Sequence, residues 1–235
     1  MGEHTVSSFD QELDEIDRLI VQMGTLAQRM VGDSTRALLS ADERLAARVV
    51  SEDATLDAFQ RDLDARVITL IGKRQPMAQD LRAAVGALRM AADLERIGDL
   101  AKNVAKRVNA VGRAPVAETL SNSIESMSRV VQDAVSDVLD HYTAHNAEAL
   151  QALRVDDEKI DIRYTAIFRE LLTYMMEDPR VITTCTHLLF CAKNLERIGD
   201  HVTNIAENAY YVTTGLQLPA KRPKRDETMP AASVS

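Results

Sequence analysis

The chain has 235 residues, 46% of them hydrophobic, which is enough to bury a sizeable core in one large domain or two smaller ones. Aromatic residues make up only 4%, and glycine and proline are scarce, a composition that favours helices over strands. The net charge of −8 excludes nucleic-acid binding through overall charge, and no apolar run is long enough to span a membrane.

Apolar residues recur at helical spacing in six long stretches that turn residues separate. Helices are therefore predicted at residues 8–40, 43–72, 77–111, 117–146, 147–177 and 179–214. Ser7 or Ser8 is expected to cap the first helix and Asp42 the second, while Gly215 ends the last. Residues 217–235, rich in Pro, Lys, Ser and Ala, are expected to form a disordered tail. The first residues lack the apolar segment of a secretory signal, so we expect a cytoplasmic protein.

A six-residue motif occurs twice. Leu94-Glu95-Arg96-Ile97-Gly98-Asp99 returns as Leu195-Glu196-Arg197-Ile198-Gly199-Asp200, 101 residues later. Shifting the first two predicted helices by 104 residues also places Ile20 on Ile124 and Met23 on Met127. The sequence therefore predicts an all-α fold built by tandem duplication of two antiparallel three-helix bundles, residues 1–112 and 113–216.

The repeated motif places acidic side chains on one face of a helix, because residues at i, i+4 and i+8 lie above one another. A second acidic pair at i and i+4 lies on the middle helix of each half. The candidate metal ligands are Glu95, Asp99, Asp53 and Asp57 in the first half and Glu196, Asp200, Asp157 and Asp161 in the second. Asn103, Asn204, Arg96 and Arg197 are candidate supporting residues.

Four carboxylates that converge in one half are stable only if they are protonated, solvent-exposed, paired with Arg or Lys, or bound to metal. Oxygen ligands suit hard or borderline cations such as magnesium, manganese or iron. In a second interpretation Arg96 and Arg197 neutralise the carboxylates, and the protein is a helical adaptor without metal.

A third interpretation is a ferritin-like di-metal carboxylate protein, but such sites use Glu-x-x-His and His201 lies five residues after Glu196. The sequence contains no Gly-rich phosphate loop, no His-Glu-x-x-His and no Cys-x-x-Cys. No nucleophile can be matched with a base. We therefore expect a protein that is not an enzyme.

The two Glu-Arg-Ile-Gly-Asp copies, the Arg74–Arg82 segment RQPMAQDLR and the Leu195–Glu207 segment LERIGDHVTNIAE together resemble the PhoU family. The resemblance covers residues 8–215 in length, duplication and motif order. It implies two similar three-helix bundles whose E/D-x-x-x-D motifs bind metal clusters in some members, with iron, zinc, manganese or magnesium as the candidates here.

The resemblance also implies a function. PhoU proteins are adaptors that contact the ATPase subunit of a phosphate ABC transporter and a membrane sensor histidine kinase. They are negative regulators that hold the phosphate-starvation response off when phosphate is plentiful. We accordingly expect a cytoplasmic homodimer that acts in phosphate transport and homeostasis, with no nucleic-acid partner and no membrane insertion.

Overall fold

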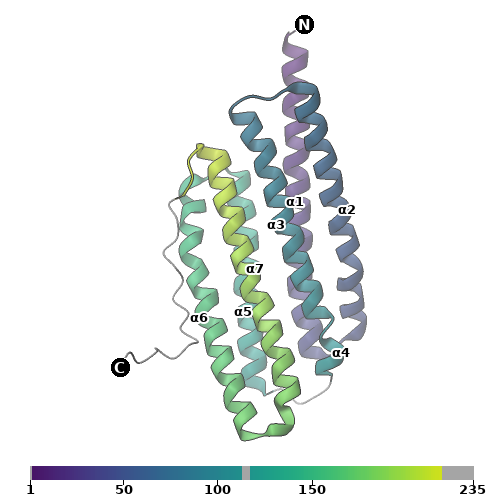
Figure 1. The fold of residues 1–235 in the computed structure, drawn as a ribbon, viewed down its shortest axis with the longest axis vertical. Helices are drawn as coiled ribbons and strands as arrows, with labels where there is room; N and C mark the ends of the chain where they lie inside the picture. Colours follow the sequence, from purple (N-terminus) through teal and green to yellow (C-terminus); the bar gives the residue numbers. More distant parts are fainter. Residues whose placement is uncertain (1, 113–116, 219–235) are drawn as a thin grey trace, which may run out of the picture.

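The computed structural model describes residues 2–112 and 117–218, without the side chains of residues 2–8, 10 and 154–157. Six long helices form two groups of three that lie side by side (Figure 1). The helices are α1 (Gly2–Ser40), α2 (Glu43–Arg74), α3 (Gln79–Ala105), the short α4 (Val108–Val111), α5 (Glu118–Thr143), α6 (Ala147–Glu177) and α7 (Ile182–Thr214). The predicted all-α duplication is thus confirmed. Most of the predicted tail, residues 219–235, lies outside the described residues.

Local capping explains several helix ends. The Asp42 carboxylate accepts hydrogen bonds from the backbone N–H groups of Arg44 and Leu45, both at 3.0 Å, as expected of an N-cap. At the start of α6 the Asn146 side-chain oxygen accepts one hydrogen bond, from the Ala149 N–H at 3.1 Å, and Gly215 ends α7 in a left-handed conformation. The predicted start of the first helix is wrong, because α1 already begins at Gly2.

The third predicted helix is interrupted. The sequence predicts an unbroken helix to residue 111, but α3 ends at Ala105 and α4 begins at Val108. At the break the Arg107 N–H donates to the Val104 carbonyl, three residues back, at 3.0 Å. The equivalent stretch of the second half, residues 206–208, lies within α7, which continues through it to Thr214. The last predicted helix differs at its start, where the turn Pro179–Val181 is a 3₁₀ helix that precedes α7.

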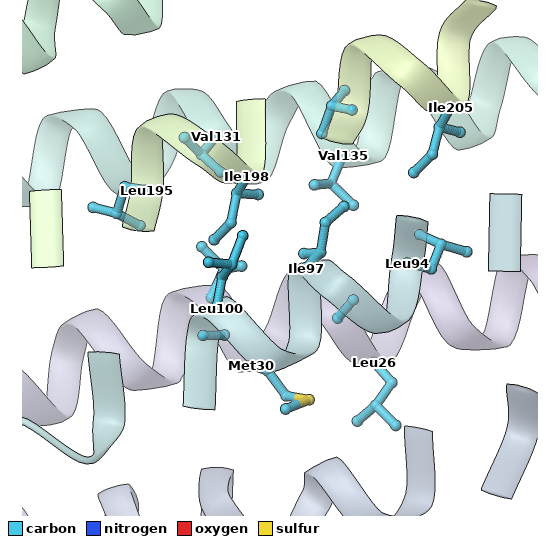
Figure 2. Close-up of a cluster of buried hydrophobic side chains, with 14 of the residues drawn as sticks. Leu26, Met30, Leu94, Ile97, Leu100, Val131, Val135, Leu195, Ile198 and Ile205 are labelled. Carbon is cyan, nitrogen blue, oxygen red and sulfur yellow. The ribbon is translucent and has the colours of Figure 1, made fainter. Parts of the chain in front are cut away.

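One hydrophobic core runs through both halves. In the first, α1, α2 and α3 pack on one another, and in the second α5, α6 and α7 do so. The halves meet where α3 lies along α7 and α1 along α5 (Figure 1). Figure 2 shows Ile97 of α3 and Ile198 of α7 in the cluster between these helices, with Val135 of α5 beside them. All three side chains are fully buried, so each bundle completes its core with residues of the other.

Two polar contacts join α1 to α5. The Gln28 side-chain amide donates to the Gln132 carbonyl at 3.0 Å, so a residue contacts its own counterpart in the repeat. The Tyr142 hydroxyl donates a short hydrogen bond to the Asp17 carboxyl. Burial raises the pKa of Asp17, although the hydrogen bond from Tyr142 acts in the opposite direction. Burial and the nearby Asp17 charge together raise the pKa of Tyr142 well above its ordinary value of 10.0.

We expect Asp17→Asn to flatten the pH dependence of stability. Because the pKa of Asp17 is higher in the folded chain than its ordinary 3.8, the folded state binds the proton more tightly. The stability that this proton contributes is present at low pH and is lost as the pH rises through the folded pKa. Asparagine keeps an acceptor for Tyr142 without the buried charge. Urea unfolding across the acid range checks this, with the exposed Asp133→Asn on α5 as control, and an unchanged profile for Asp17→Asn would contradict it.

No helix among the described residues is both long and apolar enough to span a membrane.

Candidate functional site

The first-half acidic site contains a lysine that sequence reasoning did not include. The Lys102 ammonium lies 2.6 Å from Asp53 Oδ2 of α2 and 2.6 Å from Asp99 Oδ1 of α3. The antiparallel packing of α2 on α3 thus brings the two acidic faces together, as expected. Only 18% of the Lys102 side chain is exposed. The ammonium therefore lies between the two carboxylates and is within ion-pair distance of both.

The surroundings shift the pKa values of Glu95 and Asp99, the two acids of the motif, in opposite directions. Burial raises the pKa of Glu95, and the charges of Asp99 and Asp57 raise it further, so these side chains lie within electrostatic reach of one another. For Asp99 burial acts in the same direction, but the hydrogen bond and charge of Lys102 outweigh it and lower the pKa. Arg96 Nη1 also lies 3.1 Å from Asp99 Oδ2, which agrees with the predicted arginine pairing. Asp53 and Asp99 are thus paired with cations of the chain itself, and Glu95 lies 3.6 Å from Arg96.

The glycine of the motif allows α2 to pack closely at this site. A Cβ at Gly98 would overlap Leu56 Cδ2, and Leu56 is fully buried. We expect Gly98→Ala to lower the free energy of unfolding by about 1–3 kcal/mol, because the fully buried Leu56 side chain must shift within the core to make room for the new methyl group. Gly72→Ala is the control, since a Cβ there would have no heavy atom of another residue within 4 Å. Denaturant unfolding measures both, and equal stability of the two variants would contradict the packing argument.

The second-half site has no lysine at the position that Lys102 occupies in the first half. Thr203, buried in α7, stands at the position equivalent to Lys102. Glu196 is also buried, and its Oε2 lies 2.9 Å from the Lys193 ammonium, which is on the outer side of the helix. Asp161 of α6 and Asp200 of α7 are half-buried. The fourth predicted ligand, Asp157, has its side chain outside the described residues.

Across the side chains that the structure describes, no three His, Cys, Asp or Glu residues form a group that could hold a metal ion. The candidate supporting residues lie on different surfaces. Arg197 is exposed, whereas Asn103 and Asn204 line hollows between α3 and α7.

Two grooves lie along the contact between α3 and α7. The larger, of about 610 Å³, is here called the acidic groove, and it contains Asp93, Glu95 and Glu207 together with Arg89 and Arg96. At its edge His201 Nδ1 lies 2.8 Å from Asp93 Oδ1, and the Asn204 amide donates to the same oxygen at 3.3 Å. This contact joins the two halves, and no local pattern in the sequence could have predicted it.

The fold and site together define a class: helical proteins with two repeated three-helix bundles and an acidic motif at the same position in each. The PhoU domain model matches residues 20–108 and 124–209, one match in each half. The chain belongs to the PhoU family. It is 52% identical over 232 residues, 99% of this chain and 98% of the relative, to the Rhizobium meliloti (strain 1021) protein named phosphate-specific transport system accessory protein PhoU homolog.

Two solved structures have the same fold. The crystal structure of PhoU from Pseudomonas aeruginosa has a TM-score of 0.81 and 35% identity, and the match covers 88% of this chain and 100% of that one. The phosphate transport system regulatory protein PhoU from Streptococcus pneumoniae has a TM-score of 0.83 and 27% identity, with 90% and 100% covered. The resemblance based on the repeated motif is confirmed over nearly the whole chain.

Proposed function

We propose that this chain is a non-enzymatic regulator of phosphate uptake and of the phosphate-starvation response. It acts in the cytoplasm as an adaptor between the ATPase subunit of a phosphate ABC transporter and a sensor histidine kinase, and it holds the response off when phosphate is plentiful. The observation that carries this proposal is the near full-length match to a relative named as an accessory protein of the phosphate-specific transport system.

Deletion of the gene tests the regulatory role. In a host grown with abundant phosphate, the deletion is expected to switch on a phosphate-starvation reporter and to change phosphate uptake, and a plasmid copy of the gene is expected to reverse both. An unchanged reporter together with unchanged uptake would overturn the proposal. Pull-down of the ATPase subunit and of the kinase cytoplasmic domain with the purified chain tests the adaptor step separately.

We also propose a metal site, of iron, zinc, manganese or magnesium, at the carboxylates of the second half. Glu196, Asp200, Asp161 and Asp157 supply only hard oxygen donors, and Thr203 stands where the first half has Lys102. Because the described side chains form no metal-binding group by themselves, the proposed site requires Asp157 as well. The first-half carboxylates are less suited to a metal than those of the second half. In the first half a metal would have to displace the Lys102 ammonium, which already binds Asp53 and Asp99.

Thr203→Lys and Thr203→Met distinguish metal binding from a metal-free adaptor. Both side chains are long, but only lysine places an ammonium among the second-half carboxylates. Elemental analysis of the purified proteins is expected to find metal in the wild type and in Thr203→Met, and to find it lost in Thr203→Lys. Wild-type protein without stoichiometric metal would favour the metal-free adaptor, and metal-dependent oxygen consumption would favour the ferritin-like alternative. A homodimer is part of the proposal and is tested by sedimentation velocity.

A further inference from the structure

The second groove between α3 and α7 is the repeat-related counterpart of the acidic groove. It has a volume of about 350 Å³ and is lined by Asn103, Lys106, Arg107, Ala110, Phe190 and Asn194. Each of these positions, shifted by 101 residues, falls on a lining residue of the acidic groove, at 204, 207, 208, 211, 89 and 93 respectively. The duplication therefore produced two equivalent grooves, one at each end of the α3–α7 contact.

The two grooves have opposite charge. Lys106 stands where the acidic groove has Glu207, and Arg107 stands where it has Asn208. Asn194 likewise stands where the acidic groove has Asp93. Among the described side chains no carboxylate lines the second groove, which is here called the basic groove. Within the described residues, neither Lys106 nor Arg107 has a carboxylate partner. The chain as a whole is acidic, with a net charge of −8, yet these two neighbouring cations are not neutralised by a carboxylate. Their positive electrostatic potential is therefore available to an anionic ligand.

Arg107 is held in place by groups that leave its charge intact. Its Nη1 donates to His187 Nδ1 at 2.8 Å, so this nitrogen of the imidazole is the acceptor. The guanidinium carbon lies 4.6 Å from the centroid of the Phe190 ring, a cation–π contact. Lys106 and Arg107 lie at the break between α3 and α4, and both line the groove. The positive charge is thus fixed before any ligand arrives, which lowers the ordering cost of binding.

We propose that the basic groove is a binding site for a phosphate-class oxyanion, either inorganic phosphate or the phosphate of a monoester. The groove offers an ammonium and a guanidinium, with the side-chain amides of Asn103 and Asn194 beside them. Four donor side chains around one groove suit a tetrahedral anion, which has four oxygens and up to two charges, better than a planar carboxylate. The proposal rests on the groove itself and does not depend on the regulatory role, so either can fail without the other.

Titration of the full-length protein by isothermal calorimetry tests the site, with inorganic phosphate, AMP and acetate as separate ligands. We expect phosphate or AMP to bind with a Kd no weaker than about 10 mM, and acetate to bind much more weakly. The double variant Lys106→Gln/Arg107→Gln is expected to lose about 10- to 100-fold in affinity, because charge-assisted hydrogen bonds are lost. If only AMP binds, the site takes a monoester, and if both bind equally, it takes the phosphate group alone.

The control is Arg61→Gln/Arg89→Gln, which removes two positive charges elsewhere, one of them from the acidic groove. It is expected to keep wild-type affinity. Lys106→Gln alone tests the site in case the double variant does not fold, because Lys106 is exposed and its replacement should not disturb the fold. It is expected to weaken binding several-fold and to leave the melting temperature unchanged. The proposal is overturned if neither phosphate nor AMP binds the wild type at about 10 mM. It is also overturned if the folded Lys106 or double variant binds as the wild type does.

Discussion

Replacement of Ile97 by alanine is expected to lower the free energy of unfolding by about 2–5 kcal/mol, the usual cost of removing a large aliphatic side chain from a filled core. Ile97 is fully buried on α3, and it lies in the cluster that both halves share (Figure 2). Helices of two bundles surround it, so no single helix can move to fill the cavity without disturbing the others. The measurement is equilibrium unfolding in guanidinium chloride.

Ile68→Ala is the matched control, because the same atoms are removed from a side chain that is 67% exposed on α2. It is expected to change stability by less than about 1 kcal/mol. Ile198→Ala, the equivalent change in α7, is expected to cost as much as Ile97→Ala. If only one of these two variants lost stability, the interpretation that both halves contribute equally to the core would be wrong.

Lys102→Met is expected to lower the free energy of unfolding by about 2–3 kcal/mol at neutral pH, between the values for exposed and for buried ion pairs. Methionine keeps the length of the side chain but removes the ammonium that joins Asp53 to Asp99. Two carboxylates are then left facing each other across α2 and α3. The loss is expected to shrink as the pH falls, because protonation relieves their repulsion.

Unfolding at several pH values, with and without added Mg²⁺ or Mn²⁺, measures this effect. A divalent ion is expected to restore part of the lost stability, since it can bind the carboxylates that lysine has left. Arg61→Met removes an exposed cation from α2 and is the control. A Lys102→Met protein as stable as this control would show that the ammonium contributes nothing to the site.

The sequence was sufficient to predict the six helices and the duplication, because apolar periodicity and the repeated motif are both long signals. It also predicted the Asp42 cap, whose chemistry is local. It did not predict the interruption after Ala105. No glycine or proline marks that position, and the preceding helix has the composition of an unbroken one. The break is therefore set by packing against other helices and not by local preference.

The candidate site was predicted only in part, because helical spacing is a local signal and contacts between helices are not. Helical spacing alone placed Glu95 and Asp99 on one face. That Asp53 would meet them depended on the antiparallel packing of α2 on α3, which the duplication made a reasonable expectation. Lys102 was missed although it lies three residues after Asp99, a spacing at which helical side chains interact. The metal ligands themselves remain a prediction.

The shared core has a consequence for the pairing of the two halves. Each half presents an apolar face, on α3 or on α7, that only the other half covers. The two faces occupy equivalent positions in the repeat, so α3 and α7 pair as two copies of one unit would across a dimer interface. Because both copies lie in one chain, this pairing is unimolecular and independent of concentration. The two copies also differ in ways that the subunits of a homodimer cannot, since Lys102 stands where the second half has Thr203, and Arg107 stands where it has Asn208.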